Sequence, residues 1–357
     1  MKTGACIYAL FAGLALLAAP PLSVAFQDPL DTPAVMDARA PRSLLNDIVL
    51  AGKRLVAVGQ RGHIVYSDDH GKHWTQAAVP VSSDLTAVSF PTPMMGWAVG
   101  HDGVVLATKD GGVTWARQLD GRAAALLMKH YYTTNPPLEM TEGSEALTQL
   151  QADVARFAEE GPDKPFLDVW FENESTGYVV GLFNLIFRTS DGGKSWTPLF
   201  DRTENARLLH FYAVHPVDDD LYLTGEQGMV LRLDKKSQRF QAVSIDYKGT
   251  FFGITNAGPS ILVFGLRGNV FRSEDRGTRW RKVDTGIAVA ITAATRTTDG
   301  HVVLVSQAGH VLVSPDDGKS FTQANVERVP ASALVSVAPQ QLVIAGARGV
   351  HVKAIKQ

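Results

Sequence analysis

Short apolar runs recur along most of the chain and are separated by polar, glycine-rich turns. Runs such as 177–180 and 261–264 carry no charged residue, which is typical of strands buried on both faces. Flanking runs complete a unit of four predicted strands, a to d. In the first unit these are Leu44–Val49, Arg54–Val58, His63–Ser67 and a strand that starts at Trp74. Later units begin near Leu85, Phe166, His210, Phe251, Ala290 and Ala333.

An eight-residue turn pattern, Ser/Thr-x-Asp-x-Gly-x-x-Trp/Phe, stands between strands c and d of five units. Its aspartates are Asp69, Asp110, Asp191, Asp275 and Asp316, and a degenerate copy ends at Phe240. The aromatic residues that end successive copies are 41, 81, 44, 40 and 41 residues apart; they are Trp74, Trp115, Trp196, Phe240, Trp280 and Phe321. A fixed period of about 40 to 45 residues with several strands is typical of a β-propeller blade.

A second repeated turn, Gly-x-x-Gly, stands between strands b and c. Its copies start at Gly59, Gly100, Gly181, Gly225, Gly265, Ser306 and Gly346, with one glycine replaced in the third and sixth. Seven such turns predict an all-β, seven-bladed β-propeller with Asp-box turns over residues 28–357. The last unit contains only three predicted strands. We therefore predict that residues near Ala34–Ala38 supply its outer strand and close the ring, which removes an exposed edge; the alternative is a disordered N-terminal tail.

The step of 81 residues contains an insertion at 118–165, between blades 2 and 3. Apolar residues at 147, 150, 154 and 157 follow the helical period, and Gly161–Pro162 ends that helix. A second short helix is predicted over Ala123–His130, with Tyr131 and Tyr132 in the loop that follows. The alternative, a hidden eighth blade, is disfavoured because neither turn pattern occurs there.

Propeller topology assigns the loops to two faces. The c–d turns with the aspartates lie on one face. The b–c turns and the d–a connections, which include the helical insertion, lie on the other.

The N-terminal residues have the pattern of a signal peptide over residues 1–25. Lys2 precedes an apolar run from Ile7 to Ala19, and Ser23–Ala25 is a small-residue cleavage site; an uncleaved anchor is the alternative. The single cysteine, Cys6, lies within this segment. An exported mature chain without disulfides indicates a bacterial periplasm. A formal net charge of −2 argues against nucleic-acid binding.

The repeated aspartates are candidates for catalytic carboxylates, but local turn hydrogen bonds explain them better because each recurs with the same partners. The histidines show no spacing typical of metal ligands, and no nucleophile or phosphate-binding motif is present. The sequence therefore predicts a protein that is not an enzyme and that uses neither a metal nor a cofactor.

Candidate partner-binding residues lie on the face of the b–c turns. Arg61, Arg267 and Arg348 occupy one equivalent slot in units one, five and seven, and guanidinium groups suit carboxylates and interface pairs. Phe183, with Tyr131 and Tyr132 of the insertion, gives an apolar counterpart. Exposed aromatic residues beside arginines are typical of the centre of a protein interface.

Whole units, such as 166–171 with 177–181 and 189–196, resemble those of the photosystem II assembly and stability factor family. The resemblance covers nearly the whole mature chain. It implies a seven-bladed propeller of the thylakoid lumen or periplasm whose arginine-bearing face contacts a membrane-protein assembly intermediate. The helical insertion differs from the plant and cyanobacterial pattern. Members from non-photosynthetic bacteria accompany transporters of the resistance-nodulation-division (RND) type, and this chain resembles those more closely.

The predicted function is a non-enzymatic periplasmic scaffold that docks a membrane-protein complex, with an RND-type transporter favoured over a photosystem. One alternative is a sialidase-like glycoside hydrolase, which shares the Asp-box turns. Such enzymes need an Arg-Ile-Pro segment in the first blade, and Pro41–Leu44 is not one. The other alternative is a small-ligand or peptide binder at the central channel.

Overall fold

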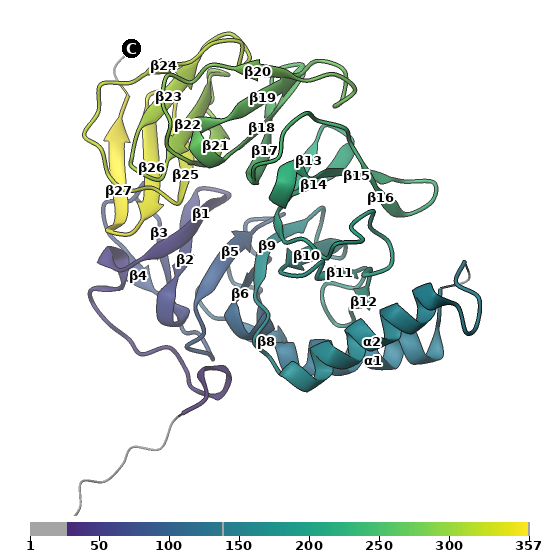
Figure 1. Cartoon of the computed structure of the whole chain (residues 1–357). Coiled ribbons are helices and arrows are strands. Elements are labelled where there is room, and N and C mark those ends of the chain that lie inside the picture. The colour runs from purple at the N-terminus through teal and green to yellow at the C-terminus, as the bar shows by residue number, and fades with distance from the viewer. Residues whose placement is uncertain (1–26, 138, 356–357) are drawn as a thin grey trace, which may run out of the picture.

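Seven antiparallel sheets are arranged radially around a central axis in the computed structural model, which describes residues 27–137 and 139–355 (Figure 1). Six sheets have four strands and one has three, and each sheet follows chain order from the axis outwards. The predicted seven-bladed β-propeller is therefore confirmed. The predicted signal peptide, residues 1–25, lies outside the described residues. Within the part of the chain that is described, no helix is both long and apolar enough to cross a membrane.

The strands of each blade follow one another in the sequence. Blades 1 and 2 comprise β1 (Leu45–Ala51), β2 (Arg54–Gly59), β3 (Ile64–Ser67), β4 (Thr75–Gln76), β5 (Leu85–Ser89), β6 (Gly96–Gly100), β7 (Val105–Thr108) and β8 (Ala116–Leu119). Blades 3 and 4 comprise β9 (Phe166–Phe171), β10 (Gly177–Gly181), β11 (Ile186–Thr189), β12 (Thr197–Pro198), β13 (Phe211–Val217), β14 (Asp220–Gly225), β15 (Val230–Asp234) and β16 (Arg239–Ala242). Blades 5 to 7 comprise β17 (Phe251–Ala257), β18 (Ser260–Gly265), β19 (Val270–Ser273), β20 (Arg281–Val283), β21 (Ile291–Arg296), β22 (Val302–Ser306), β23 (Val311–Ser314), β24 (Thr322–Gln323), β25 (Ala333–Ala338), β26 (Gln341–Gly346) and β27 (Gly349–Ala354).

The hydrophobic core is divided among the spaces between neighbouring blades. The second strand of each blade is buried along almost its whole length, because a blade lies against each of its faces. Between blades 2 and 3, for example, the Trp97 ring on β6 stacks on the Phe171 ring of β9 at 3.5 Å between centroids. The unbroken apolar runs of the sequence therefore correspond to strands covered on both sides.

The insertion forms two helices that lie side by side at the rim of the disc, α1 (Gly121–Thr134) and α2 (Glu145–Glu160) (Figure 1). Side chains of Asp120 and Ser144 cap them by accepting hydrogen bonds from Ala123 N and Leu147 N. The second helix matches its prediction. The first is longer than predicted and includes Tyr131 and Tyr132, so the predicted loop at these residues is wrong. Both tyrosines continue the helical period, and the helix ends before Pro136–Pro137.

The two faces are as predicted. Helix α1 packs against η4 (His101–Gly103), the b–c turn of blade 2. On the opposite face, the N–H of Gly111 in an Asp-box turn donates to the carbonyl of Met94 in an a–b loop, at 2.9 Å.

The prediction that residues near Ala34–Ala38 complete the last blade is wrong. Blade 7 has three strands among the described residues, and this segment lies along the outer strand of blade 1. Ala34 N donates to Val79 O at 3.1 Å, and Asp37 N donates to the side-chain oxygen of Gln76 at 2.8 Å. The chain then turns at η2 (Ala40–Arg42), which lies between β27 and β3–β4.

The sequence of the segment explains this difference. In each of the six complete blades, an apolar residue of strand d, or one directly after it, lies opposite the start of strand c; these residues are Ala77, Leu119, Leu199, Val243, Val283 and Ala324. In blades 1, 4 and 5 this residue stands eight positions before the first strand of the next blade, and the same spacing before Leu45 gives Asp37 as its counterpart in blade 7. Its carboxylate instead forms an ion pair with Arg39 at 2.9 Å, and this hydrogen-bonded pair lowers the pKa of Asp37 to about 2. This apolar position disfavours a charged side chain, because burying a charge away from water costs free energy.

Candidate partner-binding surface

The five Asp-box aspartates use their carboxylates within their own turns. In each, the Ser or Thr hydroxyl two residues earlier donates to Oδ1 at 2.7–2.9 Å, and the backbone N–H four residues later donates to the same atom at 2.8–3.0 Å. The side chain of that later residue donates to Oδ2; the donors are His73, Thr114, Ser195, Arg279 and Ser320. These are the local hydrogen bonds that the repeated pattern predicts.

These contacts favour the ionised carboxylates. The hydrogen bond from the Ser195 hydroxyl lowers the pKa of Asp191 to about 2, and the hydrogen bond from the Arg279 guanidinium does the same for Asp275. A carboxylate held in this way is a weak proton acceptor, which fits a structural role. Within residues 27–137 and 139–355, His, Cys, Asp and Glu side chains form no group of three or more that could hold a metal ion.

The three predicted partner-binding arginines all lie in exposed b–c turns. Arg61 and Arg267 have the same left-handed conformation at the middle of the turn, with φ of 55° and 57°. Arg348 lies in a tighter turn than the other two arginines. Gly349 has a positive φ there but Arg348 does not, so the backbone conformation of Arg348 differs from that of Arg61 and Arg267. None of the three guanidinium groups forms an ion pair with a side chain of the described residues. Their charges therefore remain available to a partner.

Phe183 and the two tyrosines have different environments. Phe183 is 41% exposed, and its ring lies edge-on to His210 at 4.6 Å between centroids. Tyr132 is only 1% exposed; its hydroxyl donates to Asp201 Oδ1 at 2.7 Å and so ties α1 to blade 3. Tyr131 is half-buried and packs edge-on to Tyr132 at 5.1 Å. Tyr132 is thus an attachment residue, and the prediction that it is an exposed contact is wrong.

A groove of about 500 Å³ runs between α2 and the b–c side of blades 3 and 4. Phe183 and the segment 207–210 form one wall, and Arg156, Phe157 and Lys164 form the other. Arg156 is half exposed and contacts Asp153 at 3.2 Å, and the Arg207 guanidinium donates to Gln227. No pattern in the sequence indicates this groove, because its walls come from an insertion and two blades that only the fold brings together.

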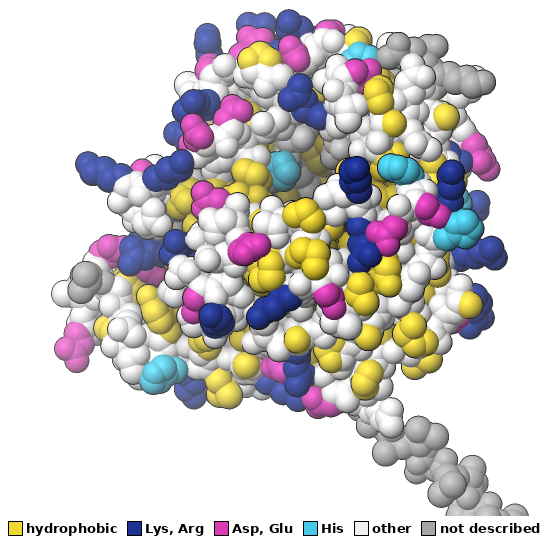
Figure 2. Space-filling model, turned by 180° about the vertical axis from the view of Figure 1, so that it is seen from behind, with side chains coloured by type: hydrophobic (Ala, Val, Ile, Leu, Met, Phe, Trp, Pro, Cys, Tyr) yellow, Lys and Arg dark blue, Asp and Glu magenta, His cyan; other side chains and the backbone are white. Residues whose placement is uncertain are grey.

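The central channel is lined by the first strands of all seven blades and holds a cavity of about 470 Å³. Viewed from behind, the molecule is hollowed at its centre, and hydrophobic and histidine side chains are visible inside the hollow (Figure 2). Asp47 and Asp168 occupy the same slot of β1 and β9, and burial raises the pKa of each. His215 is open to the channel, yet protein surrounds it on most sides, which lowers its pKa to about 4.

Comparison with known proteins identifies the family. The model of the family described as "Photosynthesis system II assembly factor YCF48" matches residues 66–130 and 157–329, which is two thirds of the chain. The chain belongs to the YCF48 family. The YCF48 model leaves residues 131–156 unmatched, and this gap contains the end of α1 and most of α2.

Similar YCF48 proteins come from cyanobacteria. The chain is 27% identical over 183 residues to the "Photosystem II assembly lipoprotein Ycf48" of Synechococcus sp. (strain CC9902), which covers 49% of this chain and 53% of that protein. It is 23% identical over 307 residues to the "Photosystem II assembly protein Ycf48" of Thermosynechococcus vestitus, covering 78% and 83%. The chain spans about half the length of the first of these relatives.

Solved structures of YCF48 proteins have the same fold. The structure described as "YCF48 bound to D1 peptide" has a TM-score of 0.64 and 16% identity, and the match covers 88% of this chain and 94% of that one. The YCF48 protein from Cyanidioschyzon merolae also has a TM-score of 0.64, with 18% identity and coverage of 91% and 98%.

Proposed function

We propose that this protein is a non-enzymatic periplasmic docking factor for an integral membrane protein, and that it binds a segment of that protein on the face of the b–c turns. The observation that carries the proposal is the combination, on one face, of three exposed arginines without ion-pair partners among the described residues and an exposed phenylalanine at the edge of a groove. Desolvated aromatic and arginine side chains supply most of the binding energy at protein interfaces. A face with these residues suits a protein partner better than a small substrate.

The relatives support the same class of partner. They are named as photosystem assembly proteins, and one YCF48 protein of known structure is described as bound to a D1 peptide. None of these names points to an RND-type transporter. We therefore assign the partner only to the class of integral membrane proteins and leave its identity to the experiment.

The groove between α2 and blades 3 and 4 supports binding of a peptide segment rather than a flat contact. Its lining combines the exposed Phe183 with charged side chains of both signs, namely Arg156, Lys164, Arg207, Glu160 and Glu226. Since the YCF48 family model leaves most of α2 unmatched, this wall is also where the chain differs from the common YCF48 pattern. The insertion would then adapt the docking face that YCF48 proteins share to a partner that is specific to this protein.

The test is capture of the partner from solubilised membranes of the source cells. The variant changes Arg61, Arg267 and Arg348 to Glu. The matched control changes Lys72, Lys194 and Lys319 to Glu, which reverses three exposed charges on the opposite face. The control should capture as much partner as the wild type. The variant should capture at least about tenfold less, as expected for removal of interface charges. Equal recovery by both would contradict the proposal, and mass spectrometry of the captured protein would separate a photosystem protein from a transporter.

A further inference from the structure

The first strands around the central channel carry one equivalent side chain per blade. Each of these residues pairs with the residue directly before the b–c turn; they are Asp47, Ala87, Asp168, Ala213, Gly253, Ala293 and Ala333. We call these seven positions the channel slots. Two of them carry a carboxyl group, and the other five carry only glycine or alanine.

In blades 1 and 3 the side chain in the channel slot bridges two blades. The carboxylates of Asp47 and Asp168 each accept two backbone hydrogen bonds of 2.8–2.9 Å. One donor is the next residue of the same strand, and the other is the equivalent residue of the next blade; the four donors are the N–H groups of Ile48, Val88, Val169 and Val214. The structure therefore shows that a carboxylate fits between two such N–H groups.

The equivalent N–H groups of blades 5, 6 and 7 have no acceptor among the described residues. They belong to Ile254, Ala294 and Leu334, which have the same register against the second strand as the four donors. In blade 7, for example, Ser332 N donates to Ala345 O. The backbone groups of the neighbouring Ile344 therefore face β27, and Leu334, which lies opposite Ile344, directs its N–H away from β26 and towards the channel.

Most channel slots cannot take a further carboxylate. In blade 2 both adjacent N–H groups already donate to Asp47 or Asp168, and in blades 4 and 7 one of the two does. In blade 5 a Cβ on Gly253 would lie 2.4 Å from the Phe264 ring, so this ring fills the slot.

The channel slot of blade 6 differs from these. It lies at Ala293, between the N–H groups of Ala294 and Leu334, and all three residues line the channel cavity of about 470 Å³. Its cross-strand neighbour is Val305, and the two slots that hold a carboxylate also lie opposite a valine. The slot of blade 6 thus has the donors and the surroundings of an Asp slot but only a methyl group as its side chain.

We propose that the central channel binds a small organic carboxylate in the slot of blade 6. Its two oxygens accept hydrogen bonds from the N–H groups of Ala294 and Leu334, as the Asp47 carboxylate does from its own pair of donors. The rest of the ligand extends into the channel cavity, beside apolar side chains such as Val335. The central hollow in Figure 2 gives a small molecule access to the channel. This site is separate from the face of the b–c turns and does not depend on the proposed docking function.

Three titratable side chains line the same cavity, namely Asp47, Asp168 and His215. Burial raises the pKa of Asp47 to about 6 and that of Asp168 to about 8, and it lowers the pKa of His215 to about 4. At about pH 5.5 both carboxyl groups are therefore mostly neutral, whereas a ligand carboxylate of ordinary pKa is still ionised. Repulsion of the ligand by the channel is then weak, and binding is best measured at this pH.

The test compares para-fluorobenzoate with para-fluorobenzamide, a neutral probe of similar shape. Binding to the full protein is followed by fluorine NMR line widths and by the amide signals of Ala294 and Leu334 in nitrogen–proton correlation spectra. In the protein, Ala293→Asp supplies an internal carboxylate to the slot of blade 6. Ala213→Asp is the matched control, because it adds the same charge in the slot of blade 4. There the buried Thr224 hydroxyl, which no described residue bonds, lies across the strand pair.

The benzoate should bind the wild-type protein and shift both amide signals, and the benzamide should bind at least about tenfold more weakly. Ala293→Asp should weaken benzoate binding at least about tenfold relative to Ala213→Asp, because its own carboxylate then occupies the two N–H groups. Equal binding of both probes, equal binding by both variants, or shifts confined to other amides would overturn the proposal. The two probes decide it on the wild-type protein even if a variant does not fold.

Discussion

The Asp47 carboxylate on β1 accepts a hydrogen bond of 2.9 Å from the backbone N–H of Val88 on β5, and so joins the first blade to the second. Asp168 on β9 does the same for Val214 on β13, at 2.8 Å. In both cases the other carboxylate oxygen accepts from the next residue of its own strand. These contacts place two carboxyl groups on the wall of the channel, where hydration is limited.

Asp47 and Asp168 should therefore contribute a fall in folding stability as the pH rises from about 4 to 8, opposite in sign to the contribution of His215 below about pH 6.5. Burial raises the pKa of Asp47 to about 6 and that of Asp168 to about 8, the latter with a contribution from Asp47. The folded state then holds protons that the unfolded state has released, so raising the pH favours unfolding. Asp168→Asn should flatten this slope between pH 5 and 8 in thermal melting. Glu159→Gln, an exposed change on α2, should leave it unchanged; a wild-type slope in Asp168→Asn would contradict the assignment.

The Asp-box aspartates should contribute to stability and not to binding. Asp191→Ala removes the acceptor for the Ser195 N–H and for the hydroxyls of Thr189 and Ser195. The expected loss is about 1–2 kcal/mol in the free energy of unfolding, measured with urea. Capture of the membrane partner at a temperature where the variant is folded should be unchanged. Normal unfolding together with lost capture would reverse the assignment.

The attachment of α1 should depend on one of its two adjacent tyrosines. Tyr132→Phe removes a buried hydrogen bond to Asp201 and should destabilise the protein by about 1–2 kcal/mol. Hydrogen exchange in α1 should become faster. Tyr131→Phe is the matched control, because no described residue bonds its hydroxyl. If both variants behaved alike, the Asp201 contact would not hold the helix.

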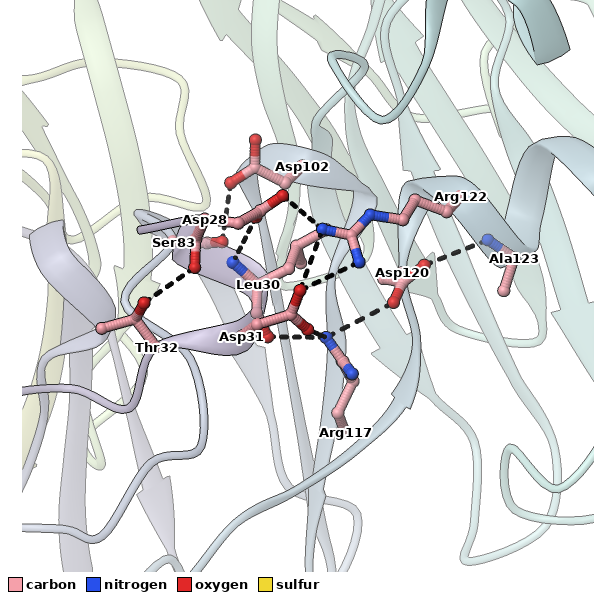
Figure 3. A network of polar contacts seen from close by, with 10 residues as sticks. All are labelled: Asp28, Leu30, Asp31, Thr32, Ser83, Asp102, Arg117, Asp120, Arg122 and Ala123. Atoms are coloured by element: carbon pink, nitrogen blue, oxygen red, sulfur yellow. Dashed lines mark hydrogen bonds and ion pairs between the residues drawn. The ribbon is translucent and has the colours of Figure 1, made fainter. Parts of the chain in front are cut away.

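The N-terminal segment should be released by salt. Its charged contacts with Arg117 and Arg122 (Figure 3) are exposed, and exposed ion pairs are screened at high ionic strength. Exchange of the Leu30 and Asp31 amides should therefore become faster as the salt concentration rises, and Arg122→Ala should reproduce this effect at low salt. Arg279→Ala, which removes an exposed pair with Asp275 far along the chain, is the control. Exchange at Leu30 that is independent of both salt and Arg122 would contradict this prediction.

The sequence predicted the features that are specified within a few tens of residues. The Asp-box turns close their hydrogen bonds within eight residues and so revealed the period of the repeat, and the seven Gly-x-x-Gly turns were enough to count the blades. The period of Leu147, Leu150, Val154 and Phe157 likewise predicted α2. The end of α1 was missed because Tyr131 and Tyr132, read beside Asn135–Pro137, were assigned to a loop.

Features that depend on competition between distant segments could not be read in this way. The position of Asp37 became informative only once the apolar position in the other blades was known. The groove requires the approach of Phe183 and Arg156, which the sequence does not indicate. One signal was available but unused: Asp47 and Asp168 stand at the same place in the first strands of units one and three.

Within residues 27–137 and 139–355, the ring closes without a strand shared by the two ends. Around most of the circle, one blade continues into the next along the chain. At the junction of blades 7 and 1, packing between the two blades holds the parts together, with β1 against β25 and β26, side chains of β2 and β3 in the same core, and η2 beside them. Mechanical pulling on the termini in a single-molecule experiment should therefore detach the C-terminal blade first, and the remaining six should then yield one after another.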